Sequence, residues 1–106
     1  MGYAKERGKL EKLSTKVTGL KIYDDKNLAI ITDIYEQYSH TVRILKNKAT
    51  DIFGGLYEND LQKVKECKRT LKASEDDDSR QNSFIKYRDT LADALERTIL
   101  ATKETL

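Results

Sequence analysis

An apolar repeat between residues 25 and 53 is the most regular feature of the chain. Apolar side chains recur there at alternating intervals of three and four residues, which is typical of one face of a long α-helix. The repeat consists of Leu28, Ile31, Tyr35, Tyr38, Val42, Leu45, Ala49 and Ile52. Asp24 and Asp25 precede the repeat, and a short carboxylate can cap a helix N-terminus. The pattern predicts a dominant helix over about 25–53, with an apolar stripe wide enough to need more than one neighbour.

Apolar spacings of the same kind predict three more helices. The first spans about 3–17 and is followed by Gly19 as a candidate C-cap. The others span about 57–74 and 80–103, and the acidic run SEDDDSRQNS separates them or interrupts one longer helix. The predicted caps of the last helix are Asp78 and Ser79.

The stretch DIFGG at residues 51–55 marks the expected reversal of the chain. Glycine can take a left-handed conformation that closes a helix, so Gly54 and Gly55 are expected to end the long helix near residue 53. An apolar pattern resumes at Leu56, and the helices on either side should therefore pack antiparallel. Phe53 is expected to cover the end of the core.

Composition supports an all-α fold. The 106 residues include no proline and five glycines, with 36% charged and 38% hydrophobic residues, a balance that suits amphipathic helices better than a sheet. The expected fold is an antiparallel helical bundle of three to four helices with one long central helix, and residues 1–106 fit a single domain. Cys67 is alone, which excludes an intrachain disulfide and favours the cytosol. No apolar run suits a membrane span, and secretion without a signal peptide stays open.

The residues that could carry catalysis or bind a metal are sparse. His40 is the single histidine, and the heptad phase places it opposite the apolar seam, whereas Cys67 falls on the apolar side of its own helix. The run Asp76–Asp78 lacks the alternating ligands and central glycine of a calcium loop. With no glycine-rich phosphate loop either, we expect no enzyme activity, no metal and no cofactor.

Positive charge is concentrated near the N-terminus. The net charge is +2, but residues 1–21 carry six basic and two acidic side chains, and residues 76–106 carry five basic and seven acidic ones. Attraction between the first and last helices would explain these opposite signs. Lys5, Lys9, Lys12 and Lys16 form one stripe that could bind an anionic partner. Tyr3 is the only aromatic residue of this helix, so nucleic-acid binding is the weaker reading.

The function expected from these features is association with another protein, as an adaptor, a regulatory subunit or a neutralising partner, in a homo-oligomer or hetero-oligomer. In size, helical character and basicity the chain is similar to small cytosolic bacteriocin-immunity proteins, with which it shares no motif. The candidate partner interface, whose members could equally form the core, is Leu28, Ile31, Tyr35, Tyr38, Val42 and Phe53.

A second reading comes from the step Phe53-Gly54-Gly55 between two predicted helices. In a chain of this size, the step resembles the Trp-x-Gly of the small hairpin proteins of type VII secretion. The resemblance implies a two-armed hairpin that is exported. The chain departs from the family because Asp76–Asp78 divide the second arm, and because Tyr87 is followed at four residues by Leu91 where the export signal has an acid.

Overall fold

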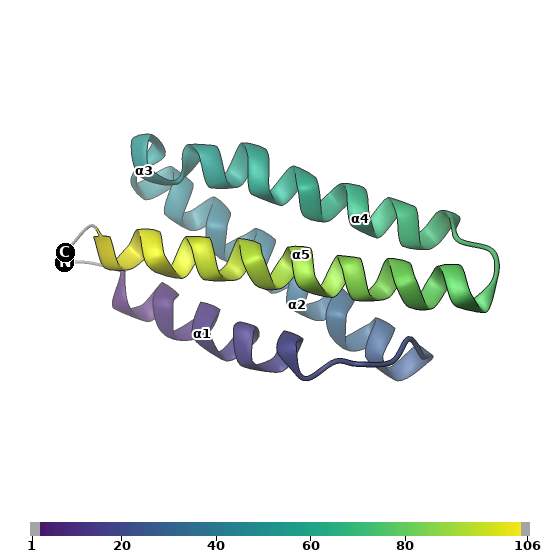
Figure 1. The fold of residues 1–106 in the computed structure, drawn as a ribbon. Coiled ribbons are helices and arrows are strands. Elements are labelled where there is room, and N and C mark those ends of the chain that lie inside the picture. Colours follow the sequence, from purple (N-terminus) through teal and green to yellow (C-terminus); the bar gives the residue numbers. More distant parts are fainter. Residues whose placement is uncertain (1–2, 105–106) are drawn as a thin grey trace.

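The computed structural model describes residues 3–104, which form four helical segments in an antiparallel bundle (Figure 1). The expected all-α bundle is confirmed. None of the helices in this range is long and apolar enough to cross a lipid bilayer. The elements are α1 (Ala4–Thr18), α2 (Asp25–Lys48), a third segment made of α3 (Thr50–Gly55), the π-helix η1 (Leu56–Asp60) and α4 (Leu61–Ala73), and α5 (Asp77–Glu104).

The central helix is α5, and not the 25–53 segment to which the apolar repeat assigned that place. Helix α5 has 28 residues against 24 for α2. It packs most extensively on α1 and α4 and also touches α2, α3 and η1. Figure 1 shows α5 along the middle of the bundle, with α2 crossing behind it at an angle. The apolar repeat overstated the length of α2, because its last two members, Ala49 and Ile52, lie at or beyond a bend in the chain.

The apolar seam of α2 forms the core together with α5, as its spacing indicates. Ile31, Tyr38, Val42 and Leu45 of α2 have no exposed surface. The residues of α5 that pack in the same core are Phe84, Tyr87, Leu91, Ala94, Leu95 and Ile99. Ile52, the last member of the repeat, is 39% exposed because it lies beyond the end of α2.

The predicted glycine turn is wrong. Helix α2 ends at Ala49, where φ is −151° and ψ is 80°, and the helical backbone resumes at once and continues through Gly54 and Gly55. No residue between 3 and 104, glycine or otherwise, has positive φ. The bend at Ala49 carries Phe53 into the core, where its ring meets the ring of Tyr3 edge to face at 5.2 Å. The chain therefore reverses through α3 and η1, without a left-handed residue.

Helix caps were predicted with mixed success. Asp24 caps α2 as expected, because its side chain accepts a hydrogen bond from the amide three residues on, at 2.7 Å. Gly19 is the C-cap of α1, in a right-handed conformation. The last helix is capped by Asp76, which accepts from the Ser79 amide at 2.7 Å, so Asp78 and Ser79 lie inside the first turn. The linker at residues 74–76 shows that α4 and α5 are separate helices.

The connection between α1 and α2 is fastened to α5 by two long side chains. The Gln81 amide donates to the carbonyl of Lys21 at 3.0 Å, and its oxygen accepts from the Tyr23 amide at 2.7 Å. The Arg88 guanidinium donates to the carbonyl of Leu20 at 2.9 Å. These bonds fix the loop against the middle helix and position Tyr23 at the edge of the core.

Candidate functional site

The residues that the sequence offered as a partner interface lie mainly inside the molecule. Ile31, Tyr38, Val42 and Phe53 have no exposed surface, and Tyr35 is also buried. Leu28 is partly covered and packs against the core. In this fold these side chains hold the four helical segments together, so they offer a partner almost no surface.

The two tyrosines of this group are anchored in different ways. The Tyr38 hydroxyl shares a hydrogen bond of 3.4 Å with the hydroxyl of Thr98 on α5, and burial raises the pKa of Tyr38 to about 12. The Lys68 ammonium lies 4.8 Å from the centre of the Tyr35 ring, within the range of a cation–π contact. Both rings therefore join α2 to a neighbouring helix.

The lysine stripe of α1 is exposed along its whole length. At 100° per residue, Lys5, Lys9, Lys12 and Lys16 fall within an arc of roughly 60°, and all four side chains are exposed to solvent. Among the side chains that the structure describes, which end at Lys103, no carboxylate lies within 4.0 Å of any of these ammonium groups. The positive charge of this stripe is therefore available to a partner.

The opposite charges of the first and last helices do not form direct ion pairs between the described residues. The two ion pairs that connect different helical segments are Glu6–Lys48 at 2.8 Å, between α1 and α2, and Asp60–Arg97 at 3.6 Å, between η1 and α5. Helix α1 is instead linked to α5 by Arg7, which donates to the side chain and the carbonyl of Thr102. The predicted attraction between α1 and α5 therefore does not rest on a direct ion pair between described side chains, and it stays a prediction.

A groove between α1 and α2 adjoins the lysine stripe. It encloses about 660 Å³ and has an apolar floor to which Leu20, Ile30 and Ile34 contribute. Ile30 is only partly covered, and Lys16 and Asp33 stand on opposite rims of the groove. Apolar floor and cationic rim together suit an amphipathic helix that carries acidic side chains on one flank. We call the stripe and the groove together the α1–α2 face.

Neither residue considered for catalysis, His40 or Cys67, lines the groove. His40 is exposed on α2. Cys67 is buried in α4, and its thiol donates to the Thr90 hydroxyl on α5 at 3.4 Å. The residues that the structure describes include no group of three or more metal-ligating side chains, and the Asp76 carboxylate is engaged as a helix cap.

A charged site at the end of the π-helix was not predicted from the sequence. Asp60 is buried, with one carboxylate oxygen 3.6 Å from the Arg97 guanidinium and the other without a hydrogen-bond partner. It lines a small cavity of about 160 Å³ together with Lys63 and Asp93. The apolar spacing could not reveal this arrangement, because the residues around Asp60 fit an ordinary α-helix equally well. π-helical turns occur frequently at functional sites.

Comparison with known proteins leaves the class of this protein defined by its fold alone. No protein-family model, no curated protein and no solved structure matches the chain. The function is therefore argued from the chemistry of the surfaces described above.

Proposed function

We propose that the protein acts without catalysis, by binding another protein, and that the α1–α2 face is its docking surface. The observation that carries the proposal is the row of four exposed lysines without ion pairs beside an apolar groove. Its partner is an amphipathic helix with an acidic flank. Such a partner would let the protein serve as an adaptor, a regulatory subunit or a neutralising partner, and a cytosolic location goes with this role.

Groove and stripe would contribute differently to binding. The stripe spans three turns of α1, roughly 16 Å, so a partner helix lying alongside would need acidic residues at matching intervals of three and four. An exposed ion pair contributes only about 0.2–1 kcal/mol. Most of the affinity would therefore come from apolar burial over Ala29 and Ile30, while the lysines would set the orientation and the association rate.

Two other readings of the sequence have less support. Nucleic-acid binding would benefit from aromatic side chains within the stripe, but the ring of Tyr3 is packed against Phe53. The type VII reading needs Phe53-Gly54-Gly55 at the turn of a two-armed hairpin. Those residues do lie where the chain reverses, but Phe53 is buried in a core that four helical segments form, and not in a two-armed hairpin.

Self-association stays a prediction. Ile30 and Ile44, which widen the apolar stripe of α2, are only partly covered in the monomer. A second copy could fill the groove, and sedimentation equilibrium over a wide concentration range would detect it. If the protein is a monomer at every concentration, no second copy fills the groove, and the groove is left for the acidic partner.

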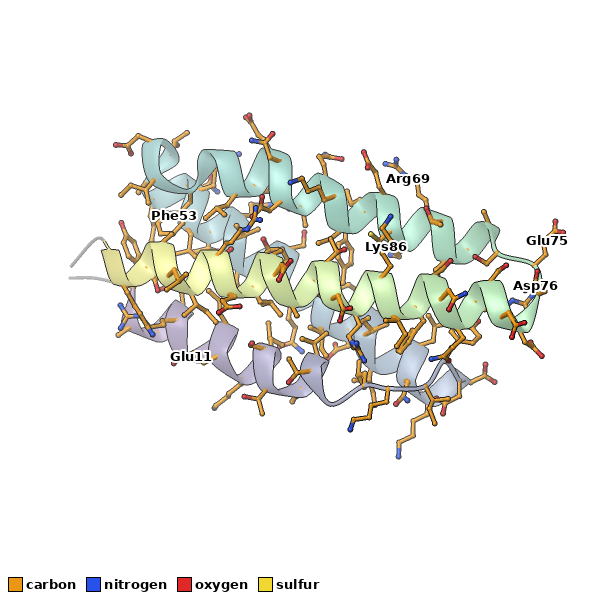
Figure 2. All side chains as sticks on the ribbon, in the orientation of Figure 1. Glu11, Phe53, Arg69, Glu75, Asp76 and Lys86 are labelled. Atoms are coloured by element: carbon orange, nitrogen blue, oxygen red, sulfur yellow. The ribbon has the colours of Figure 1, made fainter. Side chains whose placement is uncertain are left out.

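Crosslinking and capture in the native host would test the proposed function. The test variant replaces Lys5, Lys9, Lys12 and Lys16 with Gln, and a matched control replaces four exposed cations elsewhere, Lys63, Arg69, Lys86 and Lys103. Arg69 projects away from the bundle in Figure 2. We expect the stripe variant to lose at least about tenfold in captured partner, while the control retains it and crosslinks map from α1 to an acidic helix.

Three outcomes would contradict the proposal. Equal losses in the two variants would show that only overall charge matters. Crosslinks that map to another face would show that the docking surface lies there and not on the α1–α2 face. Capture that disappears after nuclease treatment and falls steeply with salt would identify nucleic acid as the partner.

A further inference from the structure

A second cavity lies between α2, α4 and α5, away from the α1–α2 face. It encloses about 330 Å³, within the size range of small-molecule sites of roughly 300–1,000 Å³. Tyr23, Leu28 and Leu71 supply apolar surface to its wall. Thr32 adds a hydroxyl group, and Ser74 lines the wall with a hydroxyl that is already bonded to Thr70 and Ser83. The cavity therefore combines an apolar interior with polar groups that could orient a ligand.

Three cationic side chains line this cavity, and their charge is little neutralised by nearby carboxylates. Lys68 and Lys72 come from α4 and Arg80 from α5. No carboxylate in residues 3–104 lies within 4.0 Å of either lysine ammonium. Arg80 donates to the Ser74 carbonyl at 3.3 Å and lies 3.8 Å from Asp77, whose side chain is fully exposed to solvent. An exposed pair of this length compensates little charge, so the cavity favours an anion.

Tyr87 of α5 forms part of the cavity wall and has an unpaired hydroxyl. The residue has no exposed surface, and its hydroxyl lacks a hydrogen-bond partner. Burial raises the pKa of Tyr87, and the neighbouring Tyr35, Cys67 and Glu36 raise it further. The hydroxyl stays protonated at neutral pH and can donate.

An unpaired buried hydroxyl is unusual in a native core, because most buried polar groups find a partner. A ligand oxygen would satisfy it. Glu36 is the acidic group near Tyr87, but it is exposed to solvent and is outnumbered by the three cations.

We infer that this cavity binds a small organic anion, with its carboxylate or phosphate held by Lys68, Lys72 and the Tyr87 hydroxyl, and its apolar or aromatic body against Leu28 and Leu71. The site is separate from the α1–α2 face, so either proposal can fail while the other stands. Small-molecule occupancy would add ligand control to a protein that otherwise works by association.

Binding can be measured with 4-fluorophenyl phosphate, an aromatic anion, by fluorine NMR and by amide chemical shifts of the full chain. Two comparison probes measure the contributions of the ring and the charge separately. Inorganic phosphate lacks the ring, and 4-fluorobenzyl alcohol lacks the charge. We expect the aromatic phosphate to bind at least about tenfold more tightly than either, with shifts centred on Thr32, Leu71, Ser74 and Tyr87.

Three variants test the proposed contacts. Tyr87→Phe keeps the ring and removes the hydroxyl, and should weaken binding roughly tenfold, the loss expected for a hydrogen bond to a charged group. Lys68→Met and Lys72→Met should each weaken binding several-fold and reduce its salt dependence. Lys63→Met, on the opposite flank of the same helix, is the matched control and should bind like the wild type.

The inference is overturned if wild-type protein shows no saturable shifts, or if the shifts centre on the α1 lysines. It is also overturned if Tyr87→Phe and the two lysine variants bind as tightly as Lys63→Met. Circular dichroism would confirm that each variant is folded. Should Tyr87→Phe fail to fold, Lys68→Met and Lys72→Met decide the outcome against Lys63→Met.

Discussion

The two ends of the bundle close the core with similar aromatic pairs. At the end that holds the chain termini, Tyr3 meets Phe53 edge to face at 5.2 Å. At the end that holds the two connecting loops, Tyr23 meets Phe84 edge to face at 5.9 Å. Figure 2 shows Phe53 at the first end and Asp76 at the second. Packing alone therefore does not distinguish the two ends.

The two ends of the bundle differ in whether their charged side chains have partners of opposite charge. At the terminal end, Glu6 is paired with Lys48, Asp60 lies near Arg97, and Arg7 holds the last turn of α5. At the loop end, Lys68 and Lys72 have no described carboxylate within ion-pair distance and stand around a cavity. Paired charges serve the stability of the fold, whereas unpaired charges beside an apolar surface are available for binding. The difference assigns compensated charge pairs to the terminal end and an uncompensated cavity to the loop end, and the exposed lysine stripe of α1, which begins near the terminal end, is separate from both.

The largest test of this comparison removes one aromatic ring from each end. Phe53 and Phe84 are both without exposed surface, so each change to Ala should cost about 3–5 kcal/mol of unfolding free energy. Urea denaturation would measure both. Similar losses would confirm that packing is alike at the two ends. If Phe53→Ala kept full stability and lost a partner or export instead, the type VII reading would gain over the core assignment.

The next test concerns the paired charges of the terminal end. The Glu6 side chain is 11% exposed and that of Lys48 is 50% exposed. Glu6→Gln should destabilise the protein at neutral pH by about 1–2 kcal/mol, the contribution of a partly screened charged hydrogen bond. Lys72→Met at the loop end is the comparison variant, because Lys72 is exposed, and its stability should change by less than about 0.5 kcal/mol.

The Glu6 contribution should depend on pH in a definite direction. The hydrogen bond from Lys48 lowers the pKa of Glu6 below its ordinary value of 4.5. The stabilisation is therefore complete above that ordinary value and is lost as pH falls through the lowered pKa. Denaturation of wild type and Glu6→Gln should converge in acid. A difference that stays constant down to acidic pH would contradict the assignment.

Sequence reasoning correctly predicted the structural features that depend on residues close together in the chain. The spacing of three and four identified the buried face of α2, because that face packs against α5 with ordinary helical geometry. The Asp24 cap and the exposure of Lys9 and its neighbours on α1 depend only on positions within one turn of helix. These features were correct in the structure.

Features that depend on tertiary contacts were missed. The bend at Ala49 occurs where Phe53 must turn inward, and nothing in the spacing around Ala49 marks it. The groove between α1 and α2 and the cavity beside Tyr87 were missed for a similar reason. The cavity beside Tyr87 brings together residues from α2, α4 and α5 that are far apart in the chain, so no local sequence motif could predict it.

Two buried tyrosines provide a finer test of the loop end. Tyr38 shares a hydrogen bond with Thr98, and its change to Phe should cost about 0.5–1 kcal/mol. Tyr87→Phe removes a hydroxyl without a partner, so the ligand-free protein should be unchanged or more stable by up to about 1 kcal/mol. Thermal and urea unfolding of the two variants, side by side, would measure the contrast. Equal losses would mean that the Tyr87 hydroxyl has a partner after all.

The smallest effect concerns how the terminal end reverses the chain. Gly54 lies in α3, and a Cβ there would meet the Thr50 Cγ2 at 3.5 Å, an ordinary van der Waals distance. Alanine loses less backbone entropy than glycine on folding, so Gly54→Ala should stabilise the protein by about 0.4–1 kcal/mol. Gly8→Ala, within α1 and facing open space, is the matched control and should give a similar gain. A left-handed turn at Gly54 would instead make its substitution destabilising by about 1–2 kcal/mol while Gly8→Ala still stabilised. Urea unfolding of the pair thus decides, by the sign of one change, whether this end is closed by continuous helix or by a glycine turn.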